Sequence, residues 1–250
     1  MSLDFSLVLP TYNERDNLAK LFGRLDRILA KYKFEVILVD DDSPDGTWAE
    51  AQVYQHRYKW LRVIRRRGER GLSSAVVCGF RHARGKILGV MDADLQHDAN
   101  RLPELLREME RADFAVATRR AVGGSDGNWA WPRRTGSWCA TLLTRLIARV
   151  PLSDPMSGFF TVRRDVFAAV DDWTLRPRGY KVLLYLYSRS LQCFGRHKIR
   201  LREVGYEFRE RRYGQSKFSV KVVLDFVAML FDLRLHPKHL ARAALLPARP

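Results

Sequence analysis

The chain has 250 residues, of which 46% are hydrophobic, so it can bury a substantial core and is not a disordered tail. Its 44 Lys and Arg residues against 28 Asp and Glu residues leave a formal net charge of +16, which favours an anionic partner: nucleic acid, anionic lipid or a phosphorylated substrate. Cys78, Cys139 and Cys193 show no metal-ligand or redox spacing, so we expect reduced, buried thiols in a cytosolic protein.

Short β-rich runs alternate with longer stretches of helical periodicity from the first residues onward. The N-terminus lacks the basic-then-apolar pattern of a signal peptide, and no apolar run reaches the roughly 20 residues that span a bilayer. The alternation predicts an α/β fold, a mostly parallel sheet flanked by helices, with ligands at the carboxyl ends of the strands. The expected strands are Phe5–Leu9, Phe34–Val39, Leu61–Ile64, Ile87–Met91 and Phe114–Thr118.

The pattern changes after Thr118, where a Gly-rich loop leads into a Trp- and Arg-rich helix and then a Ser-Asp-Pro turn. We expect one domain over 1–215, in two parts that divide after Thr118. Residues 216–250 are expected to form a C-terminal amphipathic, apolar helix and a tail near a membrane. Such a helix either packs against the domain or lies in a membrane interface.

The sharpest chemical feature is the acidic segment MDADLQHD, residues 91–98, at the end of the fourth expected strand. In an extended segment, residues two apart project to the same side, so Asp92, Asp94 and Gln96 are expected to converge. Two carboxylates and an amide oxygen suit Mg²⁺ or Mn²⁺ with positions open for phosphate oxygens. The alternative is a turn whose aspartates cap the helix that begins before Leu102.

Two further polar segments follow the first and second strands: PTYNE at 10–14 and DDDSPDGT at 40–47. Their acidic side chains can accept hydrogen bonds from the base N–H or the ribose hydroxyls of a nucleotide. For Asn13 and Asp45, a role as helix N-cap is the favoured alternative.

Together these segments resemble the dolichol- or polyprenol-phosphate mannose synthases of glycosyltransferase family 2, which have the Rossmann-like GT-A fold. The resemblance runs from about Leu7 to Lys217. It implies one catalytic domain over 1–215, with a nucleotide-sugar half (1–118) and an acceptor half (119–215). PTYNE and the DxD of 92–94 indicate only the broad family, whereas SDPMSGFF at 153–160 and the YGxSK ending are much narrower. The other matching motifs are Arg70-Gly71-Leu72, Thr118-Arg119-Arg120, Arg133-Arg134 with Ser137, Gly179-Tyr180-Lys181 and Arg211-x-Tyr213-Gly214-x-Ser216-Lys217.

The resemblance implies roles for individual residues. It implies a Mg²⁺ or Mn²⁺ ion held by Asp92, Asp94 and Gln96. It implies acceptor-phosphate contacts from Arg119, Arg133 and Ser137, with Arg211 and Lys217 reaching the phosphates from a mobile loop. It implies nucleotide-sugar contacts from Pro10, Tyr12, Glu14, Asp40, Asp41, Asp92, Ala93, Asp94 and Lys217. The residues implied in catalysis are Asp94, Arg119, Arg133 and Arg211.

The basic residues also indicate binding of anions, because guanidinium groups hold phosphate through paired, charge-assisted hydrogen bonds. In the expected helix from Trp129 to Arg149, the spacing of Arg134, Trp138, Arg145 and Arg149 places them on one face. Arg beside Trp suits a lipid headgroup zone, and the alternative is an ordinary exposed helix face.

The run Arg65-Arg66-Arg67 favours a solvated loop, although its position before Gly71-Leu72 leaves a diphosphate contact open. His97 and the other histidines show no ligand spacing, so we assign them no chemistry.

The expected reaction is inverting transfer of mannose from GDP-mannose to dolichyl or polyprenyl phosphate, giving polyprenyl-phosphate mannose and GDP. The acceptor phosphate is already ionised near neutral pH, so no dedicated general base is needed. We expect a peripheral enzyme on the cytoplasmic face of a membrane, attached through its interfacial helices or a small membrane-anchoring partner.

Three alternatives remain. One is a glucosyl- or aminosugar transferase that uses a UDP-sugar and the same lipid. Another is a basic nucleic-acid-binding module, which the pI near 10.2 suggests but the acidic strand ends oppose. The last is a catalytically silent membrane scaffold with this fold.

Overall fold

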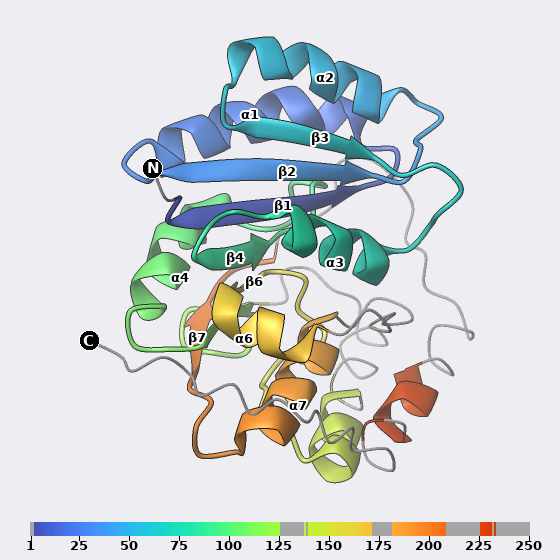
Figure 1. The fold of residues 1–250 in the computed structure, drawn as a ribbon. Coiled ribbons are helices and arrows are strands. Elements are labelled where there is room, and N and C mark those ends of the chain that lie inside the picture. Colours follow the sequence, from blue (N-terminus) through green and yellow to red (C-terminus); the bar gives the residue numbers. More distant parts are fainter. Residues whose placement is uncertain are drawn as a thin grey trace.

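The computed structural model describes residues 3–125, 138, 140–171, 182–208, 226–231 and 233. Its strands form one seven-stranded sheet in the order β3-β2-β1-β4-β6-β5-β7. Every neighbouring pair is parallel except those made by β6, which runs antiparallel to β4 and β5 (Figure 1). The strands are β1 (Phe5–Thr11), β2 (Phe34–Asp40), β3 (Leu61–Arg65), β4 (Ile87–Val90), β5 (Phe114–Thr118), β6 (Phe160–Arg163) and β7 (Leu201–Gly205).

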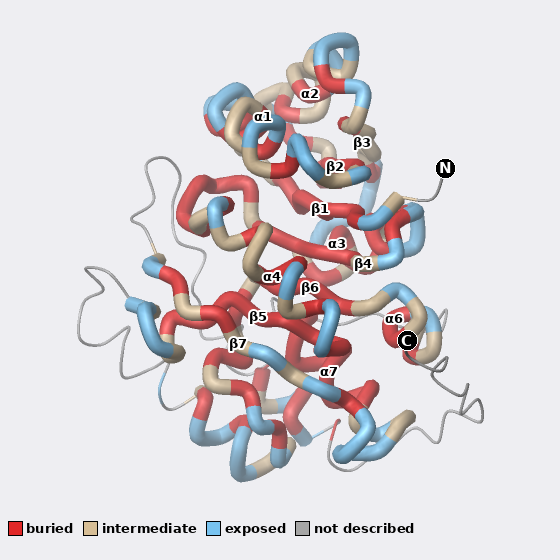
Figure 2. Tube along the Cα trace, turned by 90° about the vertical axis from the view of Figure 1, so that its left-hand side faces the viewer, coloured by how far each residue is buried: buried red, intermediate tan, exposed pale blue. Residues whose placement is uncertain are grey.

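The helices cover both faces of the sheet, and Figure 2 shows the buried strands between helices with exposed outer sides. Because side chains alternate along a strand, Val8 faces one core and Leu7 and Leu9 face the other. The first core joins the sheet to α3 (Leu72–His82), α6 (Arg164–Val170) and α7 (Val182–Phe194). The second joins it to α1 (Arg15–Leu29), α2 (Thr47–Arg57), the 3₁₀ turn η1 (Ala99–Arg101) and α4 (Leu102–Glu108).

The α/β fold with a mostly parallel, helix-flanked sheet is confirmed. The expected strands exist, with β1 and β2 continuing to Thr11 and Asp40, whereas β4 ends at Val90 instead of Met91. Antiparallel β6 has a consequence for the site: its first residue lies at the edge where the parallel strands end. The preceding segment, 153–159, therefore joins the loops at that edge.

The C-terminal helix predicted over 216–235 is described only at 226–231 and 233. Phe226, Met229, Leu230 and Leu233 are buried in the core with α7, and Gln192 of α7 donates a 2.8 Å hydrogen bond to the Leu233 carbonyl. This part of the helix therefore packs against the domain. None of the helices in the described ranges combines the length and low polarity needed to cross a membrane.

The helix predicted to run to Arg149 departs from regular α-helical geometry. Residues Thr144–Ala148 form a π-helix (η2), and Arg149, in the left-handed region at φ 52°, ends it. The wider turn departs from the α-helical spacing from which a common face of Trp138, Arg145 and Arg149 was predicted. All three residues are exposed, and Arg145 and Arg149 line one hollow. Arg134 lies outside the described residues.

The two cysteines that the structure describes, Cys78 and Cys193, are free thiols, as expected, but they are half-buried instead of buried. Cys139 lies outside the described residues.

A buried carboxylate ties the opposite, amino-terminal edge of the sheet together. Glu35 of β2 accepts hydrogen bonds from the Ser6 hydroxyl (2.7 Å), the Arg84 N–H (2.7 Å) and the Arg62 guanidinium (2.8 Å). Burial alone raises the pKa of Glu35, but these donors outweigh it and lower the pKa below the ordinary value of 4.5. The ionised form therefore stabilises the fold.

Replacing Glu35 by Gln tests this contribution. Since the folded pKa is lowered, the stability is present above the ordinary glutamate pKa and is lost as the pH falls through the folded value. Glu35→Gln should lower the free energy of unfolding at neutral pH by about 1–3 kcal/mol and flatten its decline with acid. Urea unfolding at several pH values measures both effects, and equal acid sensitivity of the two proteins would contradict the assignment.

Candidate functional site

The loops that follow β1 and β2 are joined by hydrogen bonds at the carboxyl edge of the sheet. The Asn13 N–H donates to the Ser43 hydroxyl (3.0 Å), and the Glu14 N–H donates to the Thr47 hydroxyl (2.9 Å). Asp45 accepts the N–H of Thr47, the first residue of α2, at 2.9 Å, but Gly46 occupies the N-cap position, so Asp45 is not the predicted N-cap. Asn13 is not the cap of α1: it has φ 62°, and Glu14 precedes the first helical residue.

Asp40 and Asp41 were both expected to contact a nucleotide. Their carboxylates accept hydrogen bonds from different parts of the protein. Asp40 is fully buried and accepts hydrogen bonds from the Thr11 hydroxyl and from the N–H and hydroxyl of Ser43. Its carboxylate therefore holds the turn after β2. Asp41 accepts the Gly71 N–H at 2.8 Å, which draws the loop after β3 towards the same edge.

The run Arg65-Arg66-Arg67 is not a solvated loop throughout. Arg66 is only 6% exposed and donates from Nε to Asp41 at 2.8 Å and from Nη1 to the Ser74 hydroxyl at 3.0 Å. The Arg65 guanidinium lies 3.7 Å from the centroid of the Trp48 ring. The buried Asp41 needs a counter-charge, and sequence spacing alone gave no sign that Arg66 supplies it.

Arg70 lies over another predicted nucleotide-contacting residue. Its guanidinium carbon is 4.8 Å from the centroid of the Tyr12 ring, a cation–π arrangement. Tyr12 is half-buried and Arg70 is exposed, so the pair brings a positive charge to the open side of the loop that follows β1.

The acidic loop after β4 is not extended. The strand ends at Val90 and Leu95 adopts φ 63°, so the two-residue alternation used to predict convergence does not hold there. Asp94 is 4% exposed and accepts the Gln96 N–H through Oδ1 (3.1 Å). Asp98 is the aspartate that caps η1, so the capping alternative applies to that residue alone.

Gly158, from the SDPMSGFF segment, lies against the carboxylate of Asp92. A Cβ added to Gly158 would be 3.0 Å from Asp92 Oδ2 and 3.3 Å from Oδ1, closer than almost any side chain approaches. Glycine at this position therefore leaves room for the carboxylate. The contact joins the acidic loop to the turn before β6, two segments far apart in the sequence.

His97, to which the sequence assigned no chemistry, contacts the same carboxylate. It is 4% exposed; Nε2 lies 3.3 Å from Asp92 Oδ2 and Nδ1 lies 2.9 Å from the Tyr206 hydroxyl. A carboxylate only accepts hydrogen bonds, so His97 donates from Nε2 to Asp92, and in that neutral tautomer Nδ1 accepts the Tyr206 proton. Burial raises the pKa of Tyr206, which keeps that donor protonated. Tyr206 follows β7 and lies 109 positions after His97, so no local sequence pattern reveals this contact.

Arg119, expected to contact the acceptor phosphate, is paired with Asp154 of the SDPMSGFF segment. Nε and Nη2 donate to the two carboxylate oxygens at 2.7 and 2.9 Å, and both side chains are buried. The Phe208 ring centroid lies 5.7 Å from the guanidinium carbon. The pair fixes the turn after β5 to the turn before β6, which is the turn that carries Gly158.

The remaining predicted site residues divide into two groups. Pro10 is a buried residue of β1 and Ala93 is 2% exposed, so each can contribute little beyond its backbone. Among the described residues, no three His, Cys, Asp or Glu side chains gather as a metal site, and the predicted set consists of two carboxylates, Asp92 and Asp94, and the Gln96 amide. Outside the described residues lie Arg133, Ser137, Arg211 and Lys217.

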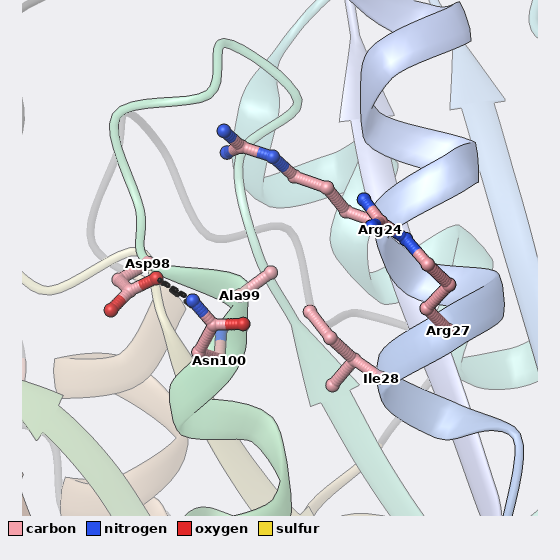
Figure 3. A pocket seen from close by; sticks show the side chains of 6 residues that line it. All are labelled: Arg24, Arg27, Ile28, Asp98, Ala99 and Asn100. Carbon is pink, nitrogen blue, oxygen red and sulfur yellow. Dashed lines mark hydrogen bonds between the residues drawn. The ribbon is translucent and has the colours of Figure 1, made fainter.

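A cavity of about 420 Å³ lies beside the acidic loop, between α1 and η1. Arg24 and Arg27 reach towards it from α1, opposite Asp98 and Asn100, which are hydrogen-bonded to each other (Figure 3). None of its lining residues belongs to the predicted site.

Removing the Tyr206 hydroxyl tests whether the Tyr206–His97–Asp92 chain orients the acidic loop. Tyr206→Phe keeps the ring in its core but leaves His97 Nδ1 without its donor. We expect Mn²⁺-dependent GDP binding to weaken roughly 10-fold, as for other residues that orient metal ligands, with a stability loss of about 1 kcal/mol. Calorimetric titration and thermal unfolding measure the two effects.

Tyr187→Phe is the matched control, because Tyr187 is equally buried but lies in the other core. Equal GDP affinity in Tyr206→Phe and Tyr187→Phe would contradict a role for the chain in binding.

Comparison with known proteins places the chain in a family. The sequence model of "Glycosyl transferase family 2" matches residues 6–171. A dolichol-phosphate mannosyltransferase from Pyrococcus furiosus is 38% identical over 91% of this chain, which spans 63% of that relative's length. One from Saccharomyces cerevisiae is 36% identical over 93% of this chain and 88% of its own length.

Solved structures give the same fold. Glucosyl-3-phosphoglycerate synthase from Mycobacterium tuberculosis, in complex with Mn²⁺, UDP and glucosyl-3-phosphoglycerate, superposes with a TM-score of 0.68 at 18% identity, over 94% of this chain and 80% of its own. At that identity the likeness shows the fold alone, and it agrees with the expected GT-A architecture. From the family match and the two mannosyltransferase relatives, we conclude that the chain belongs to glycosyl transferase family 2.

Proposed function

We propose that the protein transfers mannose from GDP-mannose to a polyprenyl or dolichyl phosphate with inversion at the anomeric carbon. The observation that carries this proposal is the contact of Gly158 with the Asp92 carboxylate, which joins the narrow SDPMSGFF motif to the acidic loop. The names of the relatives support it, including an undecaprenyl-phosphate mannosyltransferase from Micrococcus luteus, 34% identical over 88% of this chain.

The donor nucleotide is proposed to bind over the loops that follow β1, β2 and β4. Tyr12, Glu14 and Asp41 are the candidate contacts for its base and ribose, while buried Asp40 keeps the β2 turn in shape. Arg70, beside Tyr12, adds a positive charge for the diphosphate.

A divalent cation fits the acidic loop by its donor chemistry. Asp92, Asp94 and Gln96 offer hard oxygen donors within five residues, and the Asp92 side chain keeps 34% exposure. When bound, Mg²⁺ or Mn²⁺ would offset the charge of the departing diphosphate. The chain itself supplies orientation, because His97 and Gly158 define where the Asp92 carboxylate lies.

In the proposed reaction, an oxygen of the acceptor phosphate forms a bond to the anomeric carbon while the bond from that carbon to the GDP oxygen breaks. The nucleophile is already ionised, so catalysis rests on positioning and on stabilising the diphosphate. Arg119, Arg133 and Ser137 are proposed to hold the acceptor phosphate, and Arg211 and Lys217 to reach the diphosphate. The Asp154 pair holds the Nε and Nη2 side of Arg119 in a fixed direction.

We further propose that the enzyme works at the cytoplasmic face of a membrane, where its lipid acceptor resides. The net charge of +16 favours an anionic surface. A small membrane-anchoring partner is a second route of attachment.

Asp94→Asn tests the donor side. The substitution keeps an oxygen for the Gln96 N–H but removes a charge that the cation needs, so mannose transfer should fall about 100-fold or more. The assay follows labelled mannose from GDP-mannose to polyprenyl phosphate with Mn²⁺, alongside a panel of UDP-sugars. Asp98→Asn is the control from the same loop. A wild-type rate for Asp94→Asn in the presence of a chelator would refute the metal assignment.

Arg133→Ala tests the acceptor side. Losing a guanidinium that binds phosphate should raise the KM for polyprenyl phosphate roughly 10-fold and leave GDP affinity unchanged. Arg134→Ala, the neighbouring arginine, is the control for net charge, and detergent micelles keep membrane binding out of the comparison. An unchanged acceptor KM in Arg133→Ala would remove this residue from the acceptor site.

A further inference from the structure

Three arginines surround an open notch on the side of the molecule that carries α7. The notch has a volume of about 340 Å³, and its floor is made by Tyr187, Leu191, Val150 and Pro151. Arg145 and Arg149 come from η2 and its end, and Arg196 comes from the turn after α7. Two segments about 50 residues apart in sequence thus contribute cations to one hollow.

The three guanidinium groups are exposed, and within the described ranges none of them pairs with a carboxylate. This differs from Arg66 and Arg119, whose charges are balanced by Asp41 and Asp154. Like charges gathered without a counter-charge repel one another, and an anion in the notch would relieve that repulsion.

The helical turns leading into the notch expose apolar side chains. Trp138 is 58% exposed, Leu142 40% and Leu146 66%. Large apolar side chains next to arginines suit the boundary between lipid headgroups and acyl chains. A soluble phosphate ester is polar and would not cover these exposed apolar side chains.

The lining of the notch reaches two levels of the sheet. The Tyr187 ring contacts Phe114 at the start of β5, with centroids 5.1 Å apart, whereas Arg119 follows the end of that strand, about 13 Å further along. Pro151, also in the lining, lies three residues before Asp154, which pairs with Arg119. The micelle assay below therefore decides whether the notch is separate from the acceptor site.

We propose that the notch formed by Arg145, Arg149 and Arg196 binds the phosphate headgroup of an anionic bilayer lipid other than the acceptor. Guanidinium groups hold the phosphate, and Trp138, Leu142 and Leu146 enter the interface beside it. Burial raises the pKa of Tyr187 to about 12, so its hydroxyl remains a donor at neutral pH. The inference rests on the proposed function only in that both place the protein at a membrane.

The test is vesicle cosedimentation of the whole chain without donor or acceptor. Vesicles contain phosphatidylcholine alone or phosphatidylcholine with phosphatidylglycerol. Replacing Arg145, Arg149 and Arg196 together by Gln should weaken binding to the anionic vesicles about 100-fold, roughly fivefold for each arginine, and leave weak binding to neutral vesicles unchanged. All three residues are exposed, so thermal unfolding should not change.

The matched control replaces Arg27, Arg107 and Arg111 by Gln, which removes the same charge from exposed positions on and beside α1 and α4, against the other core. Equal loss of vesicle binding in the two triple variants would reduce the effect to net charge and overturn the site. Binding of free glycerol 3-phosphate that is lost only in the notch variant would make it a site for soluble phosphate esters, which also overturns the lipid assignment.

Mannose transfer in detergent micelles separates the two proposals. A notch variant that loses vesicle binding but keeps the wild-type rate in micelles supports the headgroup site. Loss of transfer in micelles would place these arginines in the acceptor site and overturn a separate lipid site. Absence of transfer by the wild-type chain would refute the proposed function without affecting the vesicle result.

Discussion

The carboxylate of Asp92 lies where three distant parts of the chain meet, and the candidate site depends on that meeting. Gly158 gives it room, His97 donates to it, and Tyr206 orients His97 from beyond β7. The Arg119–Asp154 pair fixes the turn that carries Gly158. A carboxylate held from several sides loses little conformational freedom when a ligand binds. More of the binding energy is then available to orient the ligand.

Burial divides the acidic residues of the site by role. Asp40 and Asp41 each accept three hydrogen bonds from the described part of the protein, and their charges hold loops together. Asp92 remains about one-third exposed, so it can still exchange protein contacts for ligand contacts. Counting carboxylates at a sheet edge thus overstates how many of them can bind a ligand.

The sequence predicted β1 to β5 because each is a short apolar run followed by a polar turn, and it predicted which loops share an edge. It missed β7, whose residues LREVG do not form an apolar run, although this strand pairs parallel with β5. It could not predict antiparallel β6, since strand direction depends on pairing with β4 and β5. Nor could it reveal that Arg66 is buried or that His97 reaches Tyr206, because both contacts join residues at least 25 positions apart. The π-helix before Arg149 was also not predicted, because the sequence analysis assumed regular α-helical spacing up to that residue.

The insertion of β6 between β4 and β5 bears on how the molecule unfolds. The strand lies in the part of the chain predicted to be the acceptor half, yet both of its neighbours, β4 and β5, lie in the predicted nucleotide-sugar half. Removing it would leave two sheet fragments with unpaired edges, so neither half can be expected to persist as an autonomous module. The described domain should therefore unfold cooperatively. Loop substitutions should also change the acceptor preference with less damage to the fold than replacing one predicted half by that of a relative.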